Sequence, residues 1–154
     1  MKSRVRRSTR INSAIQREFV VPERLMLFGR EMRVVVGRDD AKALQVDVND
    51  EEVVFWVKKN ASERFIYALI ISWQNKQLID FAAEVVERLG QKNNVFASID
   101  FSSKSHLGYA FQTKPRREGY AGTIIVTNKL MEVDKDLAEE NIAHAYKRLC
   151  RRLK

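Results

Sequence analysis

The spacing of apolar residues changes along the chain, and this change constrains the fold more than any other feature. Between residues 24 and 59 the apolar runs are short, and Leu44, Val46 and Val48 alternate with polar neighbours, as half-buried strands do. Between residues 76 and 89 the apolar side chains instead follow one face of a helix. Strand-like and helix-like segments occur in separate blocks, so the pattern predicts an α+β fold.

The first block predicts an antiparallel meander of three or four strands. Arg24–Phe28 and Glu31–Val36 are separated by Gly29-Arg30, and glycine in the first position suits a type II′ hairpin turn. Gly37–Asp40 supplies the next turn, and Val53–Lys58 is expected as the last strand.

The centre of the chain predicts one or two helices. Asn60–Asn75 is compatible with a buried strand or with a buried helix that has Asn60 or Ser62 as its N-cap, and the helix is favoured. Lys76–Leu89 is amphipathic, and Gly90 stands at the usual stopping position of a helix.

A second antiparallel set is predicted from the apolar runs Val95–Phe101, Leu107–Thr113 and Thr123–Thr127. The connection Lys114–Gly122 contains Pro115 and two glycines, so it is expected to project as a basic hairpin loop.

A long amphipathic helix is expected from Asp134 or Asp136 to the C-terminus. Its acids lie near its start and its cations near its end, which suits the helix dipole. The predicted buried stripe is Ala138, Ile142, Ala145, Tyr146, Leu149 and Leu153.

The domain prediction follows from size and apolar content. Residues 1–12 contain little apolar surface beyond Val5 and Ile11, so they are expected to form a flexible basic arm. The remaining residues, 13–154, suffice for a single core and are predicted to form a single α+β domain.

The net charge of +8 is concentrated in three clusters. The arm cluster is Lys2, Arg4, Arg6, Arg7 and Arg10; the loop cluster is Lys114, Arg116 and Arg117; the helix-end cluster is Lys147, Arg148, Arg151, Arg152 and Lys154. Outside these clusters 15 basic residues face 20 acidic ones, so the body of the chain is mildly acidic. Clustered cations repel one another, and a bound polyanion relieves that repulsion and releases counterions.

The favoured function is therefore non-enzymatic binding of DNA or RNA through phosphate contacts made by the three clusters. Tyr120 stands beside the loop cluster, where an aromatic ring suits base stacking. No helix-turn-helix, zinc-finger or RNP signature indicates base readout, so low sequence specificity is expected. Basic ends that only solubilise the chain are the simpler interpretation of the same residues.

The first alternative is an assembly or interaction subunit, for example of a viral particle, whose basic tails reach a protein partner, further copies of the chain or packaged nucleic acid. Such a protein is expected to expose an apolar patch.

The second alternative is a metal-dependent nuclease around Asp100. The segment SIDFSSKSHLGYAF, residues 98–111, resembles the opening of ribonuclease H-like nucleases, which implies metal ions held between several carboxylates. Only 54 residues follow Asp100, and their acids, including Glu118 and Glu132, do not stand on identifiable catalytic strands.

The sequence contains few residues in the patterns that other kinds of active site require. His144 stands in ENIAH rather than in the HExxH of zinc peptidases, to whose general layout the chain shows a slight resemblance. The glycines never form a Walker or a dinucleotide-binding loop. We therefore expect no catalytic residue, metal or cofactor.

A cytoplasmic location without membrane insertion is expected. The longest strongly apolar run, Phe65–Trp73, is shorter than the roughly 18–20 residues that span a bilayer. The basic start of the chain is not followed by the apolar region of a signal peptide. Cys150 is the only cysteine, which excludes an internal disulfide.

Overall fold

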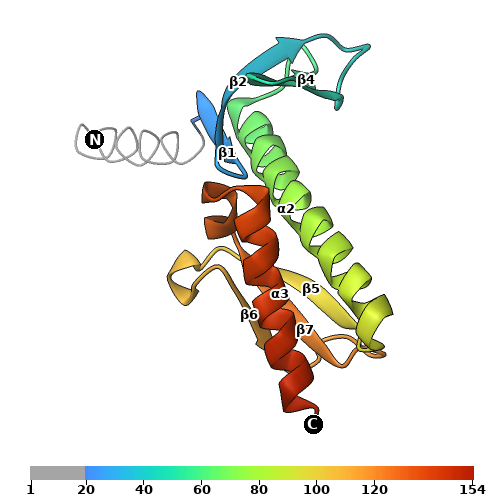
Figure 1. The fold of residues 1–154 in the computed structure, drawn as a ribbon. Coiled ribbons are helices and arrows are strands. Elements are labelled where there is room, and N and C mark those ends of the chain that lie inside the picture. The colour runs from blue at the N-terminus through green and yellow to red at the C-terminus, as the bar shows by residue number, and fades with distance from the viewer. Residues whose placement is uncertain (1–19) are drawn as a thin grey trace, which may run out of the picture. The chain divides into compact units, whose positions relative to one another are not determined.

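The computed structural model describes residues 20–154, and it confirms the α+β class. The strands are β1 (Arg24–Leu27), β2 (Arg30–Arg38), β3 (Val46–Val48), β4 (Glu52–Val57), β5 (Ala97–Ser102), β6 (Ala110–Thr113) and β7 (Gly122–Thr127). The helices are α2 (Glu63–Asn93), α3 (Lys135–Arg152) and the short 3-10 helices η1 (Ser105–Leu107) and η2 (Asn128–Glu132), as Figure 1 shows. The predicted arm, residues 1–12, lies outside the described residues.

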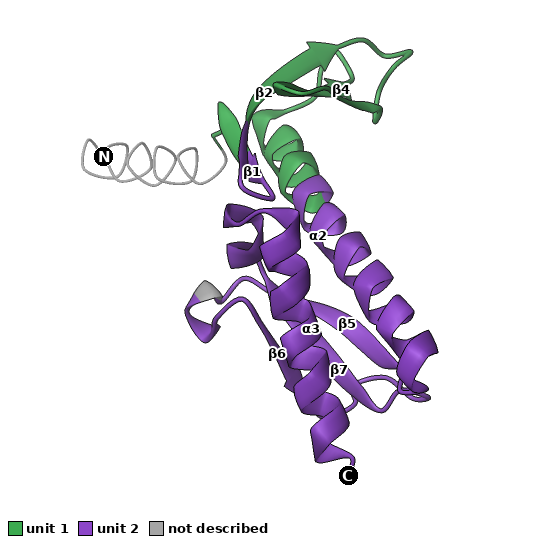
Figure 2. Ribbon diagram, viewed as in Figure 1, with its two compact units in different colours: residues 1–25, 32–72 green, residues 26–31, 73–154 purple. Residues whose placement is uncertain are grey.

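The described chain divides into two compact units (Figure 2). Unit 1 contains the described residues up to Leu25 together with Met32–Ser72, and unit 2 contains Met26–Glu31 and Trp73–Lys154. The boundary therefore falls within α2. That residues 13–154 form a single domain stays a prediction.

The first sheet has the strand order β1-β2-β4-β3. β4 is parallel to β2 and antiparallel to β3, so the prediction of a purely antiparallel meander was wrong. The chain passes from β2 to the edge strand β3 and then returns as the central strand β4. Val53, Phe55 and Val57 of β4 are completely buried, and this burial favours the central position over an edge.

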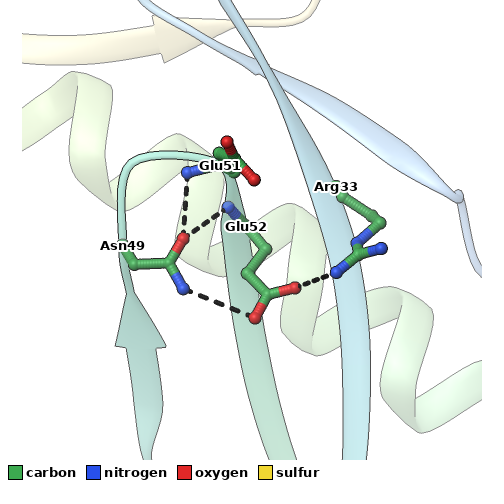
Figure 3. A network of polar contacts seen from close by, with 4 residues as sticks. All are labelled: Arg33, Asn49, Glu51 and Glu52. Atoms are coloured by element: carbon green, nitrogen blue, oxygen red, sulfur yellow. Dashed lines mark hydrogen bonds and ion pairs between the residues drawn. The ribbon is translucent and has the colours of Figure 1, made fainter.

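A polar network marks one end of the parallel β2–β4 pair (Figure 3). Arg33 and Glu52 are register partners across the two strands, and their side chains form an ion pair. The Oδ1 atom of Asn49 accepts hydrogen bonds from the backbone N–H groups of Glu51 at 2.9 Å and Glu52 at 2.8 Å. The hydrogen bond from Arg33 holds the pKa of Glu52 below its ordinary value. The network thus supports the register of the pair.

The turn between β1 and β2 is centred one residue earlier than predicted. Phe28 and Gly29 both have positive φ, 49° and 78°, as the two central residues of a type I′ turn do. The predicted type II′ turn at Gly29-Arg30 was therefore wrong. Phe28 adopts this unfavourable conformation while buried, and its ring packs against Phe81 with 4.8 Å between centroids.

The centre of the chain forms one continuous helix, α2, of 31 residues. Ser62 is its N-cap, since the hydroxyl accepts the backbone N–H of Phe65 at 3.2 Å. Gly90 was wrongly predicted as the stop, because the helix continues to Asn93 and ends before Asn94, whose φ is 55°. Neither α2 nor any other helix among residues 20–154 is both long and apolar enough to cross a membrane.

The second sheet belongs to unit 2 and has the order β5-β7-β6. β7 is parallel to β5 and antiparallel to β6, so this set is also mixed rather than antiparallel. β7 is buried along its whole length, as expected for a central strand packed beneath a helix.

The last helix, α3, closes the core of unit 2. Asp134 is its N-cap and accepts the backbone N–H of Leu137 at 2.8 Å, so of the two predicted starts, Asp134 and Asp136, the structure has the first. Five of the six predicted stripe residues are buried, but Leu153 is 52% exposed because the helix has ended at Arg152. The hydroxyl of Tyr146 donates to the backbone oxygens of Val95 at 2.7 Å and Leu89 at 3.3 Å.

Candidate functional site

The loop cluster stands on the connection between β6 and β7, as predicted. Lys114, Arg116 and Arg117 are exposed. A side chain of β7 holds the backbone of the loop, because the backbone N–H of Arg116 donates to the hydroxyl of Thr123 at 3.1 Å. That hydroxyl also hydrogen-bonds Ser98 of β5 at 2.8 Å, and both Ser98 and Thr123 are buried. A buried polar pair thus fixes the base of an exposed cationic loop.

Asp100 of β5 lies between two arginines of this loop. One carboxylate oxygen is 3.5 Å from Arg116 Nη1, and the other is 3.9 Å from Arg117 Nη2. The arginine side chains remain more than half exposed, so the ion pairs contribute little to stability. Both guanidinium groups are nevertheless oriented by an anion, as they would be by a phosphate.

The helix-end cluster is exposed on the last two turns of α3 and beyond them. Arg152 Nη1 donates to the side-chain oxygen of Gln112 on β6 at 3.5 Å. Leu149 packs against Gly122 at the start of β7, so closely that an added Cβ would lie 2.4 Å from its Cδ1 atom. Gln112 and Gly122 flank the loop that carries the loop cluster, so the two clusters lie at the same end of unit 2 (Figure 1).

Most of these cations form no ion pair with another described residue. No ion pair within residues 20–154 uses Lys114, Lys147, Arg148, Arg151 or Lys154. Two sequence segments, separated by residues 118–146, thus place exposed cations at the same end of unit 2. The arm cluster, Lys2, Arg4, Arg6, Arg7 and Arg10, lies outside the described residues.

A groove of about 550 Å³ adjoins the loop cluster within unit 2. It is lined by α2, by β5 with the residue before it, and by Arg117 and Tyr120 of the loop. Tyr120 is 42% exposed, whereas Tyr109 is partly buried against the core and Phe111 is half-buried. Of Tyr109, Phe111 and Tyr120, Tyr120 is therefore the one whose ring is most open to a ligand.

Phe96 also lines the groove and is 44% exposed, and the sequence analysis did not identify it. It stands within a run that was predicted as strand, Val95–Phe101, but β5 begins one residue after it. Because position 96 precedes the sheet, its side chain is not covered by the core.

The surroundings of Asp100 differ from those that the nuclease alternative requires. Its charged neighbours in the structure are Arg116 and Arg117. Among the described residues, no group of three or more His, Cys, Asp or Glu side chains could hold a metal ion. The carboxylate is thus placed to orient arginines.

Comparison of the chain with protein-family models, with curated proteins and with solved structures finds no match in any of the three.

Proposed function

We propose that this protein binds nucleic acid without catalysing a reaction, through phosphate contacts from the loop cluster and the helix-end cluster. The observation that carries this proposal is that the fold brings both clusters to the same end of unit 2, where Arg152 contacts Gln112. Eight exposed cations at this end of unit 2 attract a polyanion strongly, because each phosphate contact releases condensed counterions.

The anchoring of the loop supports the proposal further. Arg116 and Arg117 already surround one anion, Asp100, and the buried Thr123 hydroxyl holds the backbone of the loop. A cationic loop held in this way loses less conformational freedom when a phosphate binds than an unrestrained loop would. Phosphate contacts carry no base information, so the proposal includes low sequence specificity.

The test is a set of binding isotherms for labelled oligonucleotides at several salt concentrations. One triple variant, Lys114→Gln, Arg116→Gln and Arg117→Gln, removes the loop cluster. A second, Arg148→Gln, Arg151→Gln and Lys154→Gln, removes three cations from the helix end. Each is expected to weaken binding at least tenfold near physiological salt and to make the dependence of log affinity on log salt shallower.

The matched control neutralises three exposed lysines elsewhere, Lys58→Gln, Lys59→Gln and Lys104→Gln. It changes the net charge equally but leaves the proposed region intact. Equal weakening by the control would show that affinity follows net charge alone, and the assignment to this region would then fail.

The alternative of an assembly subunit is favoured by a separate observation in unit 1. Leu44 is 65% exposed and has a φ of 73°, which a leucine rarely adopts, and Phe65 is 47% exposed. Both line a groove of about 660 Å³. An exposed apolar side chain kept in an unfavourable conformation is typical of a contact site. If the partner is a second copy of this chain, the protein is expected to form oligomers, and Leu44→Ser is expected to dissociate them. Analytical ultracentrifugation measures the oligomeric state.

A further inference from the structure

We infer that the groove beside the loop cluster receives an unpaired nucleobase, so that the protein prefers single strands over duplexes. This inference rests on the proposed function and adds the substrate class. It is carried by two exposed aromatic side chains, Tyr120 and Phe96, that line the same groove as Arg117.

The two aromatic residues stand on two connections, one before β5 and one before β7, and a backbone hydrogen bond joins these connections. The N–H of Ala121, next to Tyr120, donates to the backbone oxygen of Phe96 at 2.8 Å. This bond holds the neighbour of Tyr120 against the residue that carries the other ring. Bases stack on such rings whatever their sequence, because every base has an aromatic face.

Phe96 is held in position by α2. A Cβ on Gly90 would lie 2.8 Å from Cδ1 of Phe96, so the ring packs directly on the helix backbone. Packing on one side and 44% exposure on the other leave the ring in place yet open to the groove. The glycine inside α2 thus has a packing role, because any side chain at this position would collide with the ring.

The charges around the groove indicate that the base binds inside it and that the phosphates bind at its border. Glu87 and Asp100 line the groove, so its interior disfavours a phosphate. A base is neutral and does not meet that repulsion. Lys114 and Arg116 stand on the loop that borders the groove, where they suit the phosphates on either side of the inserted base.

The free edge of β5 offers backbone hydrogen-bonding groups to a bound base. β5 is an edge strand of its sheet, so within the described residues half of its backbone N–H and C=O groups face away from β7. Such groups suit the hydrogen-bonding edge of a base. A duplex hides these base edges in its interior and cannot insert one without unpairing it.

The experiment compares a labelled single-stranded dT20 with a mixed-sequence 20-base-pair duplex at one salt concentration, using fluorescence anisotropy on the full chain. Wild-type protein is expected to bind the single strand more tightly. Tyr120→Ala is expected to weaken single-strand binding roughly tenfold, the loss typical of one stacking contact. Its effect on the duplex is expected to stay within twofold.

Two further variants make the result specific. Tyr120→Phe keeps the ring and is expected to restore wild-type affinity for the single strand. Phe65→Ala removes an aromatic side chain of similar exposure from unit 1 and is expected to change neither affinity.

The inference and the proposed function fail in different ways. Equal loss for single strand and duplex in Tyr120→Ala, or no loss for either, overturns the base site while the phosphate region stands. Salt-independent binding, or none, by the wild-type protein overturns both. A Phe65→Ala effect as large as that of Tyr120→Ala also overturns the base site.

Discussion

The carboxylate of Asp100 lies 3.5 Å from the guanidinium of Arg116, across the gap between β5 and the loop that precedes β7. In the proposed function a phosphate of the nucleic acid competes with this carboxylate for the guanidinium group of Arg116. Binding then exchanges an intramolecular anion for an external one, and the aspartate competes with the ligand.

Asp100→Asn is therefore expected to raise the affinity for nucleic acid about two- to fivefold, because it removes both the competitor and a repulsive charge. The melting temperature is expected to change little, since the arginine partners are more than half exposed. Anisotropy isotherms and a thermal melt measure the two effects.

The same variant separates the proposed function from the nuclease alternative. If Asp100 held a metal for catalysis, wild-type protein with Mg²⁺ or Mn²⁺ would cleave oligonucleotides and Asp100→Asn would abolish cleavage. Lower affinity in the variant would contradict the competition that we describe.

The sequence predicted those features that neighbouring residues determine. The α+β class, a helix start at Asp134 or Asp136 and most of the buried stripe around Tyr146 follow from local propensity and periodicity. The structure confirms the class and five of the six stripe residues, and it has the N-cap at Asp134. The exposed position of the basic loop also followed from Pro115 and two glycines. Each of these features depends on residues within a few positions of one another.

The sequence did not predict the features that depend on distant partners. The parallel pairing of β2 with β4 requires that β3 take the sheet edge, and no local pattern distinguishes this order from a meander. The contact of Phe96 with Gly90 depends on how the chain returns from α2 to β5. Leu153 fits the helical stripe by spacing, but the helix ends before it.

The ion pair of Arg33 and Glu52 predicts a pH-dependent contribution to stability. The hydrogen bond from Arg33 lowers the pKa of Glu52, so the pair stabilises the fold above the unfolded-state pKa of about 4.3. The contribution is lost as pH falls through the lowered pKa of the folded state. Glu52→Gln is thus expected to lower the melting temperature slightly at pH 7 and not at acidic pH.

Thermal melts of wild type and Glu52→Gln between pH 3 and pH 7 measure this difference. Lys76→Gln breaks a separate exposed ion pair with Asp80 on α2 and serves as the control, with a smaller expected effect because no register depends on it. A difference between wild type and Glu52→Gln that persists at pH 3 would show that the glutamate acts through packing.

Replacing Leu44 by a residue that tolerates positive φ is expected to raise the free energy of unfolding. Its φ of 73° is costly for leucine, and its side chain is 65% exposed, so little burial is lost when it is replaced. Leu44→Asn is expected to stabilise the protein by about 1 kcal/mol, because asparagine tolerates this conformation. The midpoint of urea unfolding measures the change.

Leu44→Ala is the matched variant, since it removes the apolar side chain without relieving the backbone. It is expected to leave stability nearly unchanged. Equal destabilisation by both substitutions would show that the leucine side chain packs into the fold, and the self-assembly alternative would then lose its supporting observation.

The final prediction separates the contribution of the helix end to binding from its contribution to folding. Deleting residues 151–154 removes Arg151, Arg152 and Lys154 together with Leu153, which is exposed. Affinity for nucleic acid is therefore expected to fall while the melting temperature stays nearly constant.

Deleting residues 147–154 is expected to lower both quantities. That deletion also removes Leu149, which is 4% exposed and packs against Gly122 beneath the basic loop. Losing a buried leucine costs roughly 2–5 kcal/mol, so the melting temperature is expected to fall by several degrees.

Deletion of residues 1–10 completes the series. It removes the five cations of the arm cluster and few apolar side chains, so the sequence predicts weaker binding without loss of stability. Thermal melts and binding isotherms on the three truncated proteins distinguish the two proposals. If deleting 1–10 destabilises the fold and leaves binding intact, these residues belong to a core or a subunit interface, and the assembly alternative replaces nucleic-acid binding as the proposed function.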